Sequence, residues 1–600
     1  MLDPHTAIHS SQKPPISRDI PPVILSAIPH ETKEVAEPAK TPKLIRHDER
    51  VRLWFKKDDR FWVPKGTVHV TLRNPLVWAT PANLIKTKLY CELVRDSLDE
   101  YSYDAELAGL DYHLAANILG LDISVGGYND KMSVLLEKVL NTMRGLVVNQ
   151  DRFDIIKERL TRAFRNAEYQ QPYYQVGDYT RYLLSERSWV NEQYIEELEH
   201  IQAEDVISFF PQLLEQTHIE VLAHGNLYKE DALRMTDMIE KILQGRALPP
   251  SQWYLRRNMI IPSGSNYVYP RTLKDPANVN HCIEYYLYIG FFSDDSLRAK
   301  LQLFSQLTDE PAFDQLRSKE QLGYVVWSGS RYNATTMGYR VIIQSERTAQ
   351  YLESRIEAFL REFGKTLESM PEDEFEGHKR SVINKRLEKL KNLGSETSRF
   401  WSHVGSEYFD FLQHETDAAN VRLLSKADLI AFYKQYIDPS SSTRAKLSIH
   451  LNAHSGAGAA DADPSQKRSR LIETVKNQLD AAGFTADNDT LTAAFEELDM
   501  AVVDRSQILY IVKTFLATEL ALSAEQIAPL SEKLEETLGV QLKQLGLEPE
   551  TNGMNGNSTT SPKEAITITD VPTFKARLPV STGPVPVSDL TEFEDFDAKL

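Results

Sequence analysis

The sequence predicts an α+β protein made of two copies of one domain, each a sheet with helices packed on one side. Two observations carry this prediction. The order helix, two strands, helix occurs twice. Short strings recur at offsets of 212 and 216 residues, with Leu110-Asp111-Tyr112 opposite Leu322-Gly323-Tyr324 and Leu136-Glu137 opposite Leu352-Glu353. We therefore expect domains at 47–248 and 262–452, separated by the polar, Pro-containing stretch 248–267.

The first copy starts with aromatic-rich runs. Leu53–Phe55 and Arg60–Val63 flank a Lys-Lys-Asp-Asp turn, which predicts a β-hairpin, and Thr67–Leu72 predicts a third strand. Helical spacing follows over Pro81–Leu107. Two further strands are expected around a turn at Asn117–Gly120. The next helix is predicted by an apolar face formed by Leu135, Leu136, Val139, Leu140 and Met143.

The second copy repeats this order. A helical segment, 296–321, precedes two strands, "GYVVWSGSRY" and "MGYRVIIQS". Pro371 and the three acidic residues after it are typical of a later helix start. A helix is also expected between the second strand and Pro371. One apolar face predicts it, formed by Leu352, Ile356, Phe359, Leu360, Phe363 and Leu367.

The remaining segments differ in character. Residues 1–46 are predicted to be an extended, Pro-rich linker without a signal peptide. Residues 466–547 are almost all helix formers, which indicates a small helical insertion of unreadable function. Residues 548–563 predict a second linker.

The composition of the chain limits which classes of partner and which cellular compartment are expected. A formal net charge of -18 argues against nucleic acid or an anionic membrane as the main partner. The sequence has no apolar run long enough to span a membrane. Two cysteines provide no disulfide framework, which favours a reducing, cytoplasmic compartment. Ala598-Lys599-Leu600 resembles the peroxisomal address Ser-Lys-Leu, so a peroxisomal location stays open.

The sequence shows no complete catalytic motif. Neither H-E-x-x-H nor its inverse H-x-x-E-H occurs, and no G-x-S-x-G elbow or P-loop is present. The nearest miss is "HCIEY", where His281 and Glu284 are expected to face opposite sides of a strand. We expect structural roles for the remaining spaced pairs, which are His218 with His224 and His450 with His454.

Arg317 and Tyr324 form the one candidate site. Gly323 can end the helix that carries Arg317, and Tyr324 then opens a strand. Arg317 carries a permanent fork of donors and Tyr324 carries a phenol donor. Both could converge on a carbonyl oxygen and stabilise the oxyanion of a peptide-bond transition state. The alternative is a surface Arg317 paired with Glu320 and a tyrosine that only packs.

Several long strings give the chain a family resemblance. They cover roughly residues 20–450 and resemble the C-terminal half of the insulin-degrading enzyme family of pitrilysin-type inverzincins. The strings are "LWFKKDDRFWVPK", "DSLDEYSYDAELAGLDY", "GYNDK", "HIEVLAHGN" and "FDQLRSKEQLGYVVWSG", with "GYRVIIQSERTAQYLESRIEAFL" after the last. The terminal "ITDVPTFKARLPV" extends the resemblance, so 564–585 are expected to complete the second domain.

This resemblance implies a fold, a cofactor and a role. Family members are clamshells of four homologous domains, and our two copies look like the third and fourth. The family's N-terminal half carries the inverted zinc motif, so zinc is expected in the complete enzyme and no metal in this chain. The C-terminal half contributes an Arg and a Tyr near the substrate, which match Arg317 and Tyr324.

The resemblance leaves alternatives open. We expect a substrate-binding half of a zinc metalloendopeptidase, inactive alone, which acts on peptides when a zinc-bearing N-terminal half joins it in cis or in trans. One alternative is a non-catalytic subunit that binds peptides or a partner. Another is a fragment that fails to fold because the face meant for the other half is exposed. The sequence does not decide between a monomer and a homodimer.

Overall fold

The fold is taken from a computed structural model of the chain. It describes residues 37–454, residues 565–595 and short helical stretches between 469 and 518. Most of the expected insertion 466–547, the linker 548–563, most of the linker 1–46 and the C-terminal tripeptide 598–600 lie outside the described residues. Within the insertion, helices α15 (Asn488–Ala494) and α16 (Arg505–Thr518) are described.

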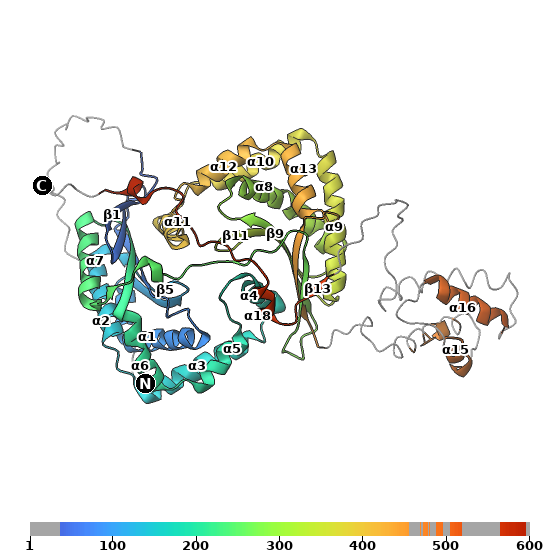
Figure 1. Ribbon diagram of the computed structural model, residues 1–600, viewed down its shortest axis with the longest axis horizontal. Coiled ribbons are helices and arrows are strands. Elements are labelled where there is room, and N and C mark those ends of the chain that lie inside the picture. Colours follow the sequence, from blue (N-terminus) through green and yellow to red (C-terminus); the bar gives the residue numbers. More distant parts are fainter. Residues whose placement is uncertain are drawn as a thin grey trace, which may run out of the picture. The chain divides into compact units, whose positions relative to one another are not determined.

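The first repeat is a sheet with helices packed on it (Figure 1). Its strand order is β1-β2-β6-β3-β5-β4, with β7 paired to β6. The strands are β1 Lys43–His47, β2 Val51–Lys57, β3 Lys65–Arg73, β4 Leu110–Asn117, β5 Gly120–Tyr128, β6 Gln216–Gly225 and β7 Arg246–Ala247. The helices are α1 Pro81–Leu107, α2 Met132–Arg144, α3 Gln150–Ala167, α4 Pro172–Leu184, α5 Asn191–His200, α6 Ala203–Glu215 and α7 Lys229–Leu243. Since β1 begins at Lys43, the sheet reaches into the segment that we expected to be a linker.

The second repeat has the same strand pattern. Its order, β10-β11-β9-β12-β8-β13, matches the first sheet read from β4 to β1. In both sheets the fourth strand of this order pairs antiparallel on one side and parallel on the other, as β6 and β12 do. The two copies expected from the sequence are therefore confirmed at the level of topology.

The elements of the second repeat come from two separate stretches of chain. Its strands are β8 Asn266–Thr272, β9 His281–Phe291, β10 Val325–Tyr332, β11 Thr336–Ser345, β12 Ala445–Asn452 and β13 Ile566–Thr567. Its helices are α8 Asp295–Ala312, the π-helix η3 Phe313–Lys319, α9 Ala349–Ser369, α10 Glu372–Arg386, α11 Leu393–Ser406, α12 Gln413–Leu423, α13 Lys426–Phe432 and the π-helix η4 Tyr433–Ile437. The edge strand β13, which pairs with β8, follows the expected insertion in sequence and lies within the segment 564–585. Three short helical turns lie outside the two sheets: η1 Asn129–Lys131, η2 Pro250–Gln252 and η5 Leu590–Phe593.

One helix of each repeat, α4 of the first and α11 of the second, packs on the sheet of the other repeat. Val176 and Leu184 of α4 pack in one apolar cluster with Tyr286 of β9. Phe400 of α11 packs in another with Trp54 of β2. A sheet with apolar residues on both faces needs cover on both, and the repeat's own helices cover only one. Helix α4 covers the second face of the second sheet, and α11 covers the second face of the first sheet.

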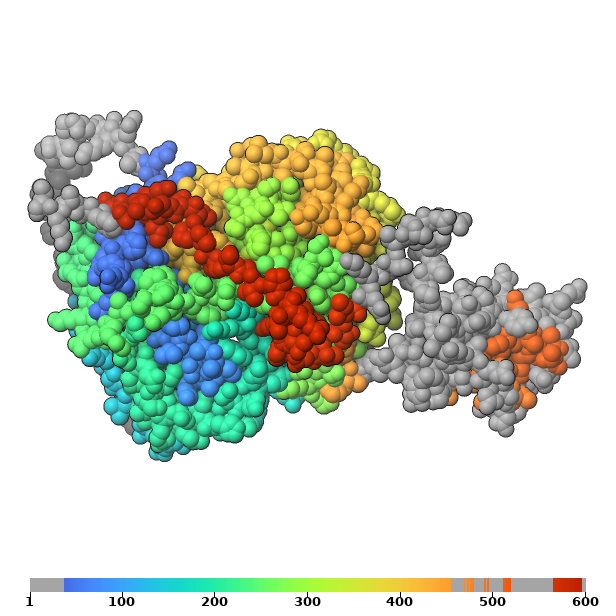
Figure 2. Space-filling model, viewed as in Figure 1, coloured from blue at the N-terminus to red at the C-terminus, as the bar shows by residue number. Residues whose placement is uncertain are grey.

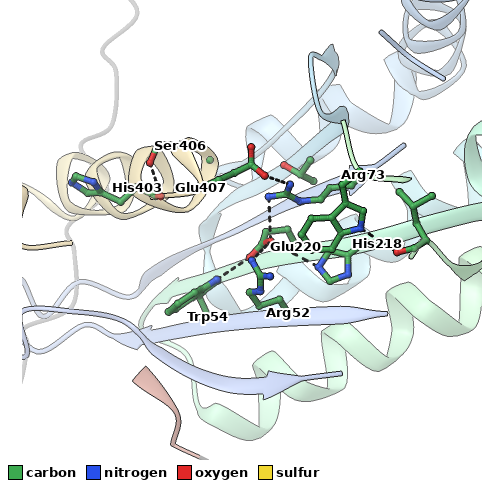
Figure 3. Close-up of polar contacts among 12 residues, drawn as sticks. Arg52, Trp54, Arg73, His218, Glu220, His403, Ser406 and Glu407 are labelled. Carbon is green, nitrogen blue, oxygen red and sulfur yellow. Dashed lines mark hydrogen bonds and ion pairs between the residues drawn. The ribbon is translucent and has the colours of Figure 1, made fainter. Parts of the chain in front are cut away.

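A buried polar network lies at this junction (Figure 3). Glu220 of β6 accepts hydrogen bonds from Trp54 Nε1 at 2.8 Å and from Arg52 Nη1 at 3.1 Å. Arg73 lies 3.4 Å from the same carboxylate and also donates to Glu407, which follows α11. Burial opposes ionisation of Glu220, but Arg52 and Arg73 outweigh it and lower the pKa of Glu220. The network therefore ties α11 electrostatically to the first sheet.

The C-terminal segment crosses the surface of both repeats, as the red strip in Figure 2 shows. It contains α18 (Val571–Ala576) and then runs as extended chain. The backbone of Ser581 bonds to Asn258 at 2.9 Å, and the backbone N–H of Asp595 donates to Leu44 of β1 at 3.0 Å. Phe593 also packs against Trp54. The segment thus links the edge strand of the first sheet to the second repeat.

The predicted hairpin over Leu53–Val63 is wrong. Only its first run becomes a strand, β2, which pairs with β1 and β6. The second run is a loop because the Asp58 carboxylate accepts backbone hydrogen bonds from Arg60, Phe61 and Val63 at 2.8–3.1 Å. A side chain that satisfies three backbone donors removes the need for a strand partner.

No helix in the described ranges is long and apolar enough to cross a membrane. Both cysteines, Cys91 and Cys282, are free and buried.

Candidate functional site

Arg317 lies on an unusual turn of helix. Helix α8 passes directly into the π-helix η3, and the backbone N–H of Glu320 bonds to the carbonyl of Gln315 at 2.9 Å. Leu316 is fully buried in the core of the second repeat and anchors the turn. Such wide turns are costly and occur frequently at functional sites. The turn presents Arg317 beside the start of β10.

Tyr324 is held at the start of that strand by a tight backbone path. Gln321 takes a left-handed conformation, with φ of 53°. Gly323 then passes so close to β11 that an added Cβ would lie 1.9 Å from the carbonyl oxygen of Gln344. Only glycine fits this approach. Tyr324 follows with 84% of its surface exposed, so its side chain does not pack into the core.

The structure brings the two predicted site residues together. The guanidinium carbon of Arg317 lies 4.6 Å from the ring centroid of Tyr324 and 4.6 Å from that of Phe313. Contacts with two rings hold the guanidinium in place, and its N–H donors lie in the plane of the group. Within the described residues neither Arg317 nor the Tyr324 hydroxyl makes a hydrogen bond or ion pair. Their donors remain available to a ligand.

The alternative ion pair between Arg317 and Glu320 does not form. Glu320 instead receives two hydrogen bonds from Arg355 of α9, at 2.7 and 2.9 Å, and one from Gln315 at 2.7 Å. Burial opposes the charge on Glu320, but Arg355 and Gln315 outweigh it and lower the pKa of this carboxyl. Glu320 therefore supports the turn through α9, and no described residue forms an ion pair with Arg317.

The strand that follows Tyr324 carries a further exposed aromatic side chain. Trp327 of β10 is half exposed and packs edge-on against Tyr173 of α4 at 5.2 Å, with Tyr174 beside it. Among the described strands, β10 is also the last of its sheet, so none of them pairs with its outer backbone edge. An edge strand and aromatic rings suit the binding of an extended peptide.

The candidate metal motifs take other roles. His281 Nδ1 accepts from the backbone of Ala453, whereas Glu284 binds Thr180 and Arg331 on the opposite face of β9. His218 and His224 are buried. Across the ranges that the structure describes, no group of three or more His, Cys, Asp and Glu is placed to hold a metal ion.

His450 has a partner that the sequence did not reveal. Its Nε2 lies 2.7 Å from Glu353, which α9 supplies from far along the chain, and 3.0 Å from Ser448. Both contacts fall on the same ring nitrogen, and Ser448 is fully buried. A serine–histidine–carboxylate relay needs one contact on each nitrogen. This cluster is therefore structural.

Comparisons with known proteins show the family of the chain. Residues 24–197 match the model for the middle or third domain of peptidase M16, and residues 303–401 match the model for C-terminal lobe domain 4 of PqqF-like PQQ synthase. Human insulin-degrading enzyme is 37% identical over 445 residues, which is 74% of this chain and 43% of that protein. The chain belongs to the insulin-degrading enzyme family of M16 peptidases.

Other relatives and a solved structure extend the comparison. The peroxisomal insulin-degrading enzyme-like 1 of Arabidopsis thaliana is 32% identical over 452 residues, covering 74% of this chain and 46% of the relative. Crystalline pitrilysin superposes with a TM-score of 0.65 at 20% identity, over 71% of this chain and 45% of pitrilysin. The chain thus spans less than half the length of these relatives.

Proposed function

We propose that this chain is the substrate-binding C-terminal half of a zinc metalloendopeptidase. It acts on peptides when a zinc-bearing N-terminal half, in cis or in trans, supplies the metal. In the parts of this chain that the structure describes, no group of three or more His, Cys, Asp and Glu residues is placed to hold a metal ion. The proposal therefore assigns no metal step to this chain.

The role proposed for this chain is to bind and orient the peptide. Arg317 and Tyr324 donate hydrogen bonds to the carbonyl oxygen of the bond to be cleaved. Charge builds on that oxygen in the transition state, so preoriented donors lower the barrier. Phe313 and Tyr324 hold the guanidinium, and the exposed Trp327 contacts apolar side chains of the peptide.

One observation carries this proposal. The Arg317 guanidinium is stacked 4.6 Å from two aromatic rings and has no hydrogen bond or ion pair among the described residues. The nearby carboxylate of Glu320 is already bound to Arg355. A cation that is oriented but unpaired suits an anionic or developing-anionic ligand.

Substitution of Arg317 in the complete enzyme tests the proposal. The enzyme is formed by joining or mixing the chain with the N-terminal half of a relative. Arg317→Ala should lower kcat by a factor on the order of 100 to 1000, the cost of removing one oxyanion donor. The thermal midpoint should fall by no more than about 2 °C, because Arg317 loses two cation–π contacts but no ion pair with any described residue.

A matched control lies on the same turn. Lys319 is exposed, and Asp314 at 2.8 Å is its one ion-pair partner among the described residues. Lys319→Ala should change kcat less than twofold. An Arg317→Ala enzyme with normal kcat and lowered thermal stability would assign Arg317 a structural role instead.

The alternative function is a non-catalytic subunit that binds peptides or a partner protein. This alternative predicts a different result when the chain is mixed with an N-terminal half. The chain would then bind a labelled peptide in the presence of an N-terminal half, yet the mixture would show no hydrolysis above that of the added half.

For location, we propose import into peroxisomes through Ala598-Lys599-Leu600, in addition to the cytoplasm. The tripeptide resembles a peroxisomal address, and the Arabidopsis relative is named peroxisomal. A fluorescent protein fused to the N-terminus should enter peroxisomes, and removal of 598–600 should leave it in the cytoplasm.

A further inference from the structure

The first repeat contains a hollow, and Arg317 is not among the residues that line it. Its volume is about 470 Å³, and helices α1, α3, α4 and α5 contribute to its walls. It lies where α4 leaves the first repeat to cover the second sheet. Volumes of 300–1,000 Å³ and positions between domains are typical of small-molecule sites.

Aromatic rings form much of the wall. Trp78 and Trp189 lie 5.6 Å apart, and Phe164 of α3 lies 5.4 Å from Tyr194 of α5. The Trp78 indole is fixed by a hydrogen bond to the carbonyl of Arg187 at 3.2 Å. Fixed, half-buried rings provide flat apolar surfaces against which another ring can pack.

Two hydrogen-bond donors in the wall have no acceptor in the described part of the chain. Lys88 Nζ lies 6.0 Å from the centroid of Phe164, the same ring that Tyr194 contacts. Neither the Lys88 ammonium nor the Tyr194 hydroxyl makes a hydrogen bond or ion pair within the described part of the chain. Burial lowers the pKa of Lys88 and raises that of Tyr194 to about 12, so both groups lack compensation for lost water.

The carboxylates in the wall already have cations. Glu168 pairs with Lys274 at 2.5 Å, and Glu192 pairs with Arg271 at 2.8 Å.

The third carboxylate, Asp178, pairs with Arg181. Lys88 is therefore the lining cation, among described residues, without a carboxylate partner. A negatively charged ligand would supply the missing partner for the Lys88 ammonium.

We propose that this hollow binds an aromatic carboxylate. The carboxylate accepts hydrogen bonds from Lys88 and Tyr194, while the aromatic ring packs against the wall formed by Trp78, Trp189 and Phe164. The same chemistry occurs in a free aromatic acid and in the C-terminal aromatic residue of a peptide, so the test includes both.

Calorimetric titration of the full chain tests this site. The probes are 3-phenylpropionate as free acid, N-acetylphenylalanine as peptide C-terminus, and 3-phenylpropionamide as the neutral control. The carboxylate should bind roughly tenfold or more tightly than the amide, because hydrogen bonds to charged groups are the stronger ones. Binding of N-acetylphenylalanine extends the site to peptide ends, and binding of phenylpropionate alone restricts it to free acids.

Variants connect any binding to the cavity. Lys88→Met should weaken the carboxylate roughly tenfold or more and leave the amide unchanged, whereas Lys88→Arg should retain binding. Lys131→Met, at an exposed lysine beside Asp130, should have no effect. Equal affinity for acid and amide, unaltered binding by Lys88→Met, or no binding at millimolar concentrations would overturn the proposal. These readouts do not depend on peptidase activity.

Discussion

Substitution of Glu220 by Gln should strongly destabilise the chain. Glu220 is 1% exposed and is the carboxylate partner of Arg52, while Arg73 retains Glu407. Gln keeps the size and a hydrogen bond for Trp54, but it removes the charge. Arg52 then stays buried as a cation without a carboxylate, and breaking a buried pair in this way costs about 3–5 kcal/mol.

The assay is denaturant unfolding of the full chain, followed by tryptophan fluorescence and by circular dichroism. Trp54 touches Glu220 and lies at the junction, so its emission reports the local change. A large protein need not unfold in two states, so the first transition is the relevant one. We expect Glu220→Gln to lower its free energy by about 3–5 kcal/mol.

A surface pair provides the control. Glu215 pairs with Arg246 at 2.7 Å, and both side chains are more than half exposed. Glu215→Gln should cost less than about 0.5 kcal/mol. The double variant Arg52→Met, Glu220→Leu should recover most of the loss, since an apolar replacement of a buried pair is often neutral. A Glu220→Gln chain as stable as the Glu215→Gln chain would refute the reasoning.

Three further predictions concern stability. Gly323→Ala should destabilise the chain by about 1–3 kcal/mol and lower the kcat of the complete enzyme, because its Cβ would meet the Gln344 carbonyl at 1.9 Å. Gly377→Ala, in a helix with the nearest atom 4.0 Å away, should instead stabilise by roughly 0.5–1 kcal/mol in thermal unfolding. Burial lowers the pKa of His69 from 6.5 to about 4, so the unfolded chain binds the proton first and stability falls as the pH drops from 6.5 towards 4. His69→Phe, which keeps a ring against Trp401, should remove on the order of 3 kcal/mol of this acid sensitivity, and an unchanged pH profile would contradict the assignment.

Local pattern in the sequence predicted much of each repeat. Helical spacing predicted α1 over Pro81–Leu107, where the structure has it, and the strands around Asn117–Gly120 are β4 and β5. These features depend on which face of one element is apolar, and sequence periodicity reports that directly.

The sequence could not predict which segment covers the second face of each sheet. The exchange of α4 and α11, and the pairs Arg73–Glu407 and His450–Glu353, join residues far apart in the chain. A buried arginine in a strand indicates only that a carboxylate must be near. The acidic Glu320 beside Arg317 was a plausible partner by spacing, and only the position of α9 shows that Arg355 takes it.

Hydrolysis of a quenched fluorescent peptide tests the central claim most directly. The purified chain is assayed with added zinc, alone and then with the zinc-bearing N-terminal half of a relative in trans. The account predicts no hydrolysis by the chain alone and clear hydrolysis on mixing, lost again with Arg317→Ala. Hydrolysis by the chain alone that a chelator abolishes would contradict it, because this chain would then hold a metal site of its own.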